Sequence, residues 1–419
     1  MKKLKLSYSA LAAFKACPMR FKGKYIDGIR REEETDSQRR GTNWHELLEV
    51  ASMKENDVCV RAYDKHHDDT CPICEGSGIL VGDATDAAVR LLKAAYDTEI
   101  PGKEIDDLYT ERAKLFYSLS AYKWYWKIDE EPAYEVVATE VPFEITVINP
   151  ETGAPARDAV LVGIIDKIVR LPDGRYAQVE HKSTSKPIDS ESTYWEHLRM
   201  DTQTTLYPYA MLRMQKEGKL EKCGIKPDDD IATTVLYDVW HVPGIKMKKL
   251  SIADTKKFVF AGVYNDEEFE IENASIQMQP GRLLKSGKHG KGKEVVAVDG
   301  TVLVDGHVAK IEVSKSGEIS IVETEGMYGT RLFANLTNEP EKYFARREIQ
   351  RSLDEMGRFE RQLHSMYQAI LMMRRTNGWW TDEFQCAARF RCDFTSYCWH
   401  GEEISKDNIL EGFKCRKEE

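Results

Sequence analysis

Residues 134–242 constrain the fold most, because their apolar positions change from helical to alternating spacing. The stretches 134–148, 159–171 and 175–183 are typical of three strands, and the "PDG" turn at 172–174 joins the last two. A helix over 194–218 and a strand over 231–242 are expected next. Three strands, a helix and another strand predict an α/β core sheet.

The regions around this core have other patterns. A short helix is expected from Ser7 or Ser9, a second from near Arg40 through "GTNWHELLEVASM", and two more over 86–100 and 104–129. The polar stretch between the second and third helices has no apolar periodicity, which predicts an insertion without its own core. Short strand-like pieces around a Lys-rich loop predict a β-rich insertion before a long helix over 340–375.

We therefore expect six parts along the 419 residues. They are N-terminal helices (1–55), a Cys/His insertion (56–84), a helical region (85–130), the core (131–242), a β-rich insertion with a basic loop (243–325), and the long helix with a cysteine-rich C-terminus (326–419).

Composition narrows the class of protein. Hydrophobic residues make up 42% and charged residues 31%, as in globular chains with a sizeable core. No apolar run reaches about 20 residues, and Ser, Lys and Cys interrupt the apolar stretch near the start, so we expect neither a membrane span nor a signal peptide, and a cytoplasmic location. A net charge of -10 argues against an overall basic surface but allows a local nucleic-acid groove.

The predicted hairpin carries three charges, Asp166, Glu180 and Lys182. Side chains alternate along a strand, so Glu180 and Lys182 share a face, and the turn brings Asp166 alongside. Buried carboxylates are costly unless a divalent hard cation binds them. The same spacing also fits a solvated face with a salt bridge from Lys182 to an acid, and the hairpin alone leaves both interpretations open.

Two further motifs flank the hairpin. Upstream, "GTNWH" supplies Gly41 and His45; downstream, "QTTLY" supplies Gln203 and Tyr207, one helical turn apart. The order of G-x3-H, Asp, Glu-x-Lys and Gln-x3-Tyr resembles the PD-(D/E)XK nuclease superfamily. It resembles in particular the RecB-like branch, which includes CRISPR-associated exonucleases and the AddB nuclease domain.

The resemblance implies a restriction-endonuclease-like α/β core, with a mixed central sheet flanked by helices. It implies a metal-dependent exonuclease that hydrolyses single-stranded DNA or DNA ends in recombination, repair or end processing, in a bacterial or phage-infected cell. Lys182 would be the catalytic lysine, and Gln203 and Tyr207 would orient the DNA and the active site. The implied ligands of Mg²⁺ or Mn²⁺ are His45, Asp166, Glu180 and the main-chain carbonyl of His181.

Four of the nine cysteines stand at the two ends of the chain: Cys17 in "CPMRF" and Cys386, Cys392 and Cys398 in "CAARFRCDFTSYC". The resemblance implies that they hold a [4Fe–4S] cluster. The family spacing is C-x2-C-x5-C, whereas this chain has C-x5-C-x5-C with Arg389 at the expected middle position, so the departure from the family falls at Cys386. Zinc on the same residues, or free buried cysteines, remain alternatives.

The Cys/His insertion offers a second set of soft ligands. Cys59, His66, Cys71 and Cys74, with His67 in place of His66, could form a zinc site, since C-x2-C before a Gly-containing turn is a recurring half of such sites. A polar loop with unliganded cysteines is the alternative. Cys223 and Cys415 have no evident partner.

The expected partner is DNA, together with a helicase, recombination or CRISPR-adaptation protein or a second copy of the chain. A nuclease-inactive, cluster-bearing DNA-binding scaffold and a CRISPR spacer-acquisition nuclease are the competing functions. The basic residues considered for DNA contacts are Arg20, Lys22 and Lys24 in the first helix, Lys285, Lys288, Lys291 and Lys293 in the basic loop, and Arg346, Arg347 and Arg351 on the long helix.

Overall fold

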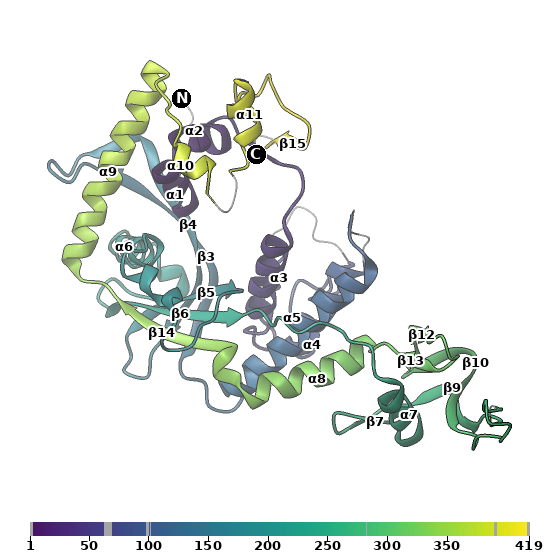
Figure 1. The fold of residues 1–419 in the computed structure, drawn as a ribbon. Helices are drawn as coiled ribbons and strands as arrows, with labels where there is room; N and C mark the ends of the chain where they lie inside the picture. Colours follow the sequence, from purple (N-terminus) through teal and green to yellow (C-terminus); the bar gives the residue numbers. More distant parts are fainter. Residues whose placement is uncertain are drawn as a thin grey trace.

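A computed structural model describes residues 3–62, 69–97, 100, 102–281, 283–388 and 392–416. Its centre is a six-stranded sheet in the order β1-β4-β5-β6-β14, with β3 paired to β4 (Figure 1). The strands are β1 (Leu4–Leu6), β3 (Glu135–Ile148), β4 (Pro155–Arg170), β5 (Tyr176–Thr184), β6 (Ile231–His241) and β14 (Phe344–Gln350). Two pairs, β1 with β4 and β5 with β6, are parallel, and the others are antiparallel. This mixed sheet flanked by helices confirms the expected fold class.

Two hydrophobic clusters hold helices against the sheet. The first joins strands β3 and β4 to α1 (Tyr8–Ala16), α6 (Gln203–Lys216) and α9 (Leu353–Thr376). The second joins the end of β6 and the start of β14 to four other helices. These are α3 (Asp36–Val50), α4 (Ala84–Tyr96), α5 (Ile105–Tyr125) and α8 (Glu325–Asn338).

The helix starts follow from their caps. Ser7 caps α1 by accepting a hydrogen bond from the Ala10 amide. The prediction that the next long helix starts near Arg40 is wrong: α3 starts at Asp36, because Thr35 and Gln38 form a capping box.

Two predicted helices are interrupted. The helix expected over 194–218 is a 3-10 helix, η2 (Thr193–Arg199), followed by α6, and the two are separated at 200–202. The helix expected over 340–375 begins instead with the short η4 (Pro340–Lys342) and the strand β14. That prediction is wrong because β14 pairs with β6 along its whole length, and α9 starts only after the capping box of Ser352 and Glu355.

The Cys/His insertion contributes buried residues to the core of the neighbouring helices. Cys59, Cys71, Ile73, Cys74 and Leu80 are all buried and belong to the cluster that packs against α3, α4 and α5. The sequence pattern concealed this burial because the apolar positions lie in turns, where neither a period of 3.6 nor a period of 2 applies.

The β-rich insertion forms a separate module, shown projecting from the sheet at the lower right of Figure 1. It has its own cluster around Phe258 of α7 (Ile252–Ala261). Its strands are β7 (Val263–Tyr264), β8 (Glu267–Glu268), β9 (Ile271–Met278), β10 (Glu294–Val304), β11 (His307–Val308), β12 (Ile311–Val313) and β13 (Ile319–Ile321).

The two ends of the chain meet at the top of Figure 1. β15 (Phe413–Cys415) pairs with β2 (Ile29–Arg31), and the Met19 amide donates to the Trp380 carbonyl at 3.1 Å. The other elements of this terminal module are α2 (Pro18–Phe21), η1 (Lys22–Ile26), α10 (Glu383–Cys386) and α11 (Thr395–His400). One further 3-10 helix, η3 (Glu221–Cys223), follows α6. In the described part of the chain, no helix is both long and apolar enough to cross a bilayer.

Candidate active site

Asp166 and Glu180 stand on neighbouring strands of the sheet. In the antiparallel pair of β4 and β5, Lys167 lies opposite Val179, so the next position along places Asp166 beside Glu180. The His181 amide donates to Asp166 Oδ2 at 2.8 Å. The structure thus brings together the two carboxylates that the hairpin pattern indicated.

Glu180 is a buried acid with an incomplete set of partners. Its side chain is 2% exposed, and its Oε1 accepts from Gln203 Nε2 at 2.6 Å and from Lys182. Its Oε2 is buried and has no hydrogen-bond partner among the described residues. Burial raises the pKa of Glu180 to about 8, with the Asp166 charge adding to the effect. A cation at Oε2 would relieve this cost.

Lys182 forms an ion pair with Glu180. Burial alone would lower the pKa of Lys182, but the Glu180 and Asp166 carboxylates outweigh it and raise this pKa above its ordinary value. The ammonium group is therefore charged at neutral pH. The salt bridge that the sequence left open does form, but because Glu180 is buried it does not lie on a solvated strand face.

His45 reaches the site from α3. Its Nδ1 lies 3.5 Å from Asp166 Oδ2, and burial lowers the pKa of the imidazole. The backbone of His181 also interacts with this ring. A neutral imidazole is the form that binds metals.

Glu140 was not predicted as a site residue. Ligand atoms of His45, Glu140 and Asp166 all lie within 4.8 Å of one another. Burial, followed by the charges of Asp166 and Glu49, raises the pKa of Glu140 to about 8. The sequence signal available was an acid within an apolar strand, as at Asp166, but the register of β3 was needed to place it. Imidazole and carboxylate ligands in this combination fit a divalent cation such as Mg²⁺ or Mn²⁺.

Gln203 and Tyr207 approach from α6, as expected from their spacing. Gln203 is buried, and besides Glu180 it interacts with the Tyr207 hydroxyl. The Tyr207 ring stands edge-on to Phe143 of β3, with centroids 5.9 Å apart. Gln203 therefore holds Glu180 in place, and Tyr207 in turn contacts Gln203.

A comparison with models of protein families agrees with this geometry. The model described as PD-(D/E)XK nuclease superfamily matches residues 5–398. The chain belongs to this superfamily. Nucleases of the PD-(D/E)XK superfamily use divalent metals, and the grouped acids and imidazole suit that use. No individual curated protein matches the chain.

The four terminal cysteines of this superfamily member lie in one neighbourhood. Burial raises the pKa of Cys398 to about 11, and the thiols of Cys386, Cys392 and Cys17 add to the effect. The Cys17 thiol also influences the pKa values of Cys386 and Cys392. Arg389, which stands at the expected middle position of the family spacing, lies outside the described residues.

Cys59, Cys71 and Cys74 form a second group, with thiol sulfurs within 4.8 Å of one another. These three residues could hold a metal ion. His66 and His67, the other ligands considered for this site, lie outside the described residues.

Several basic residues considered for DNA contacts have structural partners instead. Arg346 and Arg347 lie on the strand β14, and Arg351 directly follows it, so their placement on a long helix is corrected. Arg346 binds the buried Asp238, and Arg351 is buried against the Leu198 carbonyl. Lys22 is held by Asp27 and the Ile404 carbonyl.

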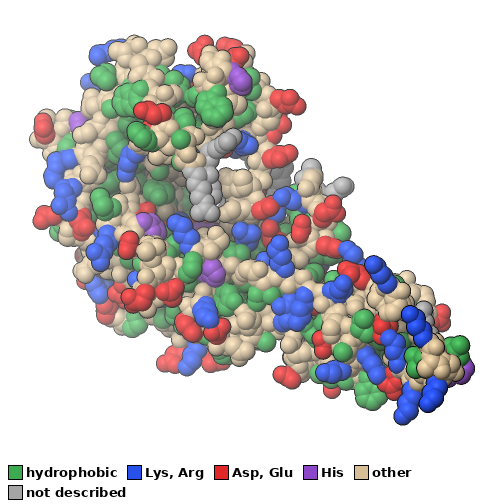
Figure 2. Space-filling view, in the orientation of Figure 1, with side chains coloured by type: hydrophobic (Ala, Val, Ile, Leu, Met, Phe, Trp, Pro, Cys, Tyr) green, Lys and Arg blue, Asp and Glu red, His purple; other side chains and the backbone are tan. Residues whose placement is uncertain are grey.

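The basic loop is more accessible. Lys285, Lys288 and Lys291 are exposed, whereas Lys293 pairs with Glu318 at 2.7 Å. Figure 2 shows Lys and Arg side chains gathered over the outer end of the β-rich module. Figure 1 shows this module projecting away from the strands β4 and β5 that carry Asp166 and Glu180, so its charge does not belong to the candidate active site.

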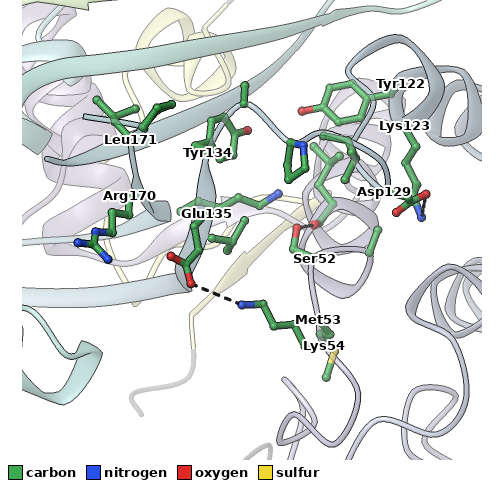
Figure 3. Close-up of a pocket in the computed structure, with 18 of the residues that line it drawn as sticks. Ser52, Met53, Lys54, Tyr122, Lys123, Asp129, Tyr134, Glu135, Arg170 and Leu171 are labelled. Carbon is green, nitrogen blue, oxygen red and sulfur yellow. Dashed lines mark hydrogen bonds and ion pairs between the residues drawn. The ribbon is translucent and has the colours of Figure 1, made fainter. Parts of the chain in front are cut away.

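A cavity of about 660 Å³ lies between α3, α5 and the turn between β4 and β5 (Figure 3). Lys54 and Glu135 form an ion pair beside it at 3.9 Å. Lys167 lines the cavity, and because side chains alternate along β4 it points to the other face of the sheet from Asp166. The cavity is therefore distinct from the acids described above.

Proposed function

We propose that the chain is a Mg²⁺- or Mn²⁺-dependent deoxyribonuclease that removes nucleotides from single-stranded DNA or DNA ends. The observation that carries the proposal is the Glu180 carboxylate, buried and unsatisfied at Oε2, beside the group of His45, Glu140 and Asp166. The RecB-like order of motifs supports action on ends or single strands, in recombination, repair or end processing.

The residues have complementary roles in this proposal. His45, Glu140, Asp166 and Glu180 would hold the metal, with the carbonyl of His181. When bound, a divalent cation polarises a phosphoryl oxygen and lowers the pKa of its water ligand.

The charged Lys182 would donate to a non-bridging phosphate oxygen and stabilise the negative charge that develops there. Gln203 fixes one oxygen of Glu180 by its 2.6 Å hydrogen bond, and the other oxygen is buried without a hydrogen-bond partner among the described residues. Gln203 is therefore a positioning residue, and Lys182 is the catalytic residue.

We further propose a [4Fe–4S] cluster on Cys17, Cys386, Cys392 and Cys398. The four cysteines come from the two ends of the chain, yet their thiols lie close enough to affect one another's pKa values. Four thiolates is also the number that such a cluster requires. Burial raises the pKa of the Cys392 thiol, and the charge of Arg20 acts against this rise and would favour the thiolate form there. The cluster would join the N-terminal helices to the C-terminal segment.

The test uses the full chain, purified anaerobically, with end-labelled linear DNA and circular single-stranded DNA, in Mn²⁺, Mg²⁺ or chelator. We expect metal-dependent release of nucleotides from linear substrates only. Lys182→Ala and Asp166→Asn should lower the rate by about 10³-fold or more, whereas Lys186→Ala, an exposed lysine next to β5, should not. Undiminished cleavage by Lys182→Ala would overturn the proposal, and metal-independent DNA binding without cleavage would favour a scaffold.

The visible spectrum tests the cluster separately. Wild-type protein should be brown and contain about four irons per chain, and Cys398→Ser should lose both properties. A colourless, iron-free wild type purified without oxygen would contradict the cluster assignment while leaving the nuclease assignment untouched.

A further inference from the structure

The group of Cys59, Cys71 and Cys74 has the dimensions of a metal site rather than of a disulfide. Cys59 Sγ and Cys71 Sγ are 3.8 Å apart, and each of the three sulfurs lies within 4.8 Å of the others. A disulfide would bring two sulfurs to about 2.05 Å. Zinc at about 2.3 Å from each sulfur of a tetrahedron separates the sulfurs by roughly 3.8 Å.

Tight backbone turns around these cysteines bring their three thiol groups together. Glu75 and Gly76 have left-handed φ values of 51° and 82° directly after Cys74, and the Glu75 amide donates to the Cys71 carbonyl at 2.8 Å. A side chain at Gly76 would meet Asp69 at 2.6 Å, so the turn closes tightly. The Cys59 amide donates to the Gly78 carbonyl at 2.9 Å, which fixes the third cysteine against this turn.

The chemistry of the surroundings also favours a cation. Cys59 and Cys74 are 1% and 0% exposed, so their sulfurs lie away from solvent. The Arg61 amide interacts with the Cys59 sulfur, as a donor to a metal-bound thiolate would. Soft thiolates in a tetrahedral arrangement select Zn²⁺ over the hard cations of the carboxylate site.

Regular secondary structure contributes little to the stability of this segment. Residues 56–83 contain no helix and no strand in their described part, only the isolated bridge between Val58 and Ile79. A loop of this length without secondary structure is uncommon inside a compact domain. Arg90 of α4 binds the carbonyls of Pro72 and Val81 at 2.8 Å each, but these contacts hold only the second half of the loop.

We propose that Cys59, Cys71 and Cys74 bind one structural Zn²⁺ as thiolates, with a nitrogen or oxygen atom as the fourth ligand. The ion would cross-link the two ends of the insertion, which packs against the helix that carries His45. Trp44 and Leu48 of α3 belong to the same cluster as the cysteines, and Arg61 pairs with Glu46 at 3.0 Å. This site is independent of the proposed nuclease chemistry.

Metal analysis of three full-length variants tests the proposal. Protein from zinc-supplemented cells, purified anaerobically, should hold about one zinc per chain. Cys71→Ser should lose the zinc and keep its iron, Cys398→Ser should keep the zinc and lose iron, and Cys223→Ser, outside both groups, should keep both. Zinc-free wild type, or zinc that follows Cys398 rather than Cys71, would overturn the proposal.

Measurements on the wild type do not depend on the variants folding. X-ray absorption at the zinc edge should show three sulfur neighbours at about 2.3 Å and one lighter atom. Removal of zinc by a chelator should lower the thermal midpoint, and Zn²⁺ but not Mg²⁺ should restore it. Four sulfur neighbours, or a thermal midpoint that does not change when zinc is removed, would refute the assignment.

Discussion

Glu140 stands opposite Asp166 across the pair of β3 and β4, at the one position in the middle of β3 where the backbone is left-handed, with φ of 45°. The neighbouring pairs are Thr139 with Lys167 and Val141 with Ile165. A non-glycine residue in this conformation is costly, and such strain is retained where the surroundings enforce it. We infer that it turns the Glu140 carboxylate toward Asp166 and His45.

Glu140→Gln should weaken Mn²⁺ binding by about 10- to 100-fold and lower DNA cleavage by a similar factor, because it removes a charged ligand. Isothermal titration of Mn²⁺ into the purified chain measures the first effect. Glu144→Gln, an exposed change on the same strand, is the matched control and should behave as wild type. Equal affinities in both variants would show that Glu140 is not a ligand.

Gln203→Leu should keep the fold but lower cleavage by about 10- to 100-fold, because Glu180 loses the hydrogen bond that orients it. Gln215→Leu provides the control on the same helix. Gln215 is also buried, and its amide binds the carbonyls of Lys226 and Asp229, so its loss should reduce stability without slowing the cleavage of end-labelled DNA. If both variants slow cleavage equally, Gln203 acts only through folding.

The sequence predicted the parts of the site that depend on local pattern. Alternation placed β4 and β5 well enough to bring Asp166 beside Glu180, and helical spacing placed Gln203. The sequence did not predict Glu140 as a site residue, because the position of Glu140 depends on the register of β3, which shifts at a bulge between Val136 and Ala138. A bulge has no signature in the alternation of a single strand.

The strand β14 was not predicted from the sequence, for a different reason. Its sequence "FARREIQ" has no clean alternation, and its charged residues fit a helix surface equally well. What stabilises it as a strand is a partner far away in sequence, since Arg346 meets Asp238 of β6. Tertiary pairing of this kind overrides local propensity.

Arg346→Met should destabilise the chain by about 3–5 kcal/mol, because it leaves the buried Asp238 carboxylate without its cation. Arg346 Nη2 lies 2.6 Å from Asp238 Oδ2, to which the Tyr122 hydroxyl also donates at 2.7 Å. The double variant Arg346→Met with Asp238→Asn should lose less free energy of unfolding than the two single variants lose together. Urea denaturation of the full chain measures all three free energies.

Arg347→Met is the control on the adjacent position. Arg347 lies over the Trp195 ring at 4.1 Å and donates to the Ser190 carbonyl, at the protein surface. Its loss should cost about 1 kcal/mol or less. A loss for Arg346→Met no larger than this would mean that Asp238 is not charged in the folded chain.

The substitution Gly163→Ala tests whether the packing of Phe143 against β4 affects the candidate active site. Gly163 of β4 pairs with Phe143 of β3, and a Cβ at position 163 would lie 2.5 Å from Phe143 Cζ. The Phe143 ring must therefore move, and with it the Tyr207 ring that it contacts edge-on. We expect a loss of about 1–3 kcal/mol in the free energy of unfolding, together with slower cleavage at unchanged Mn²⁺ affinity.

Gly244→Ala is the control, because a Cβ at this position would meet nothing within 4 Å. This change should alter neither the free energy of unfolding nor the cleavage rate. Normal cleavage in a destabilised Gly163→Ala protein would separate Tyr207 from catalysis, since the ring would then have moved without consequence.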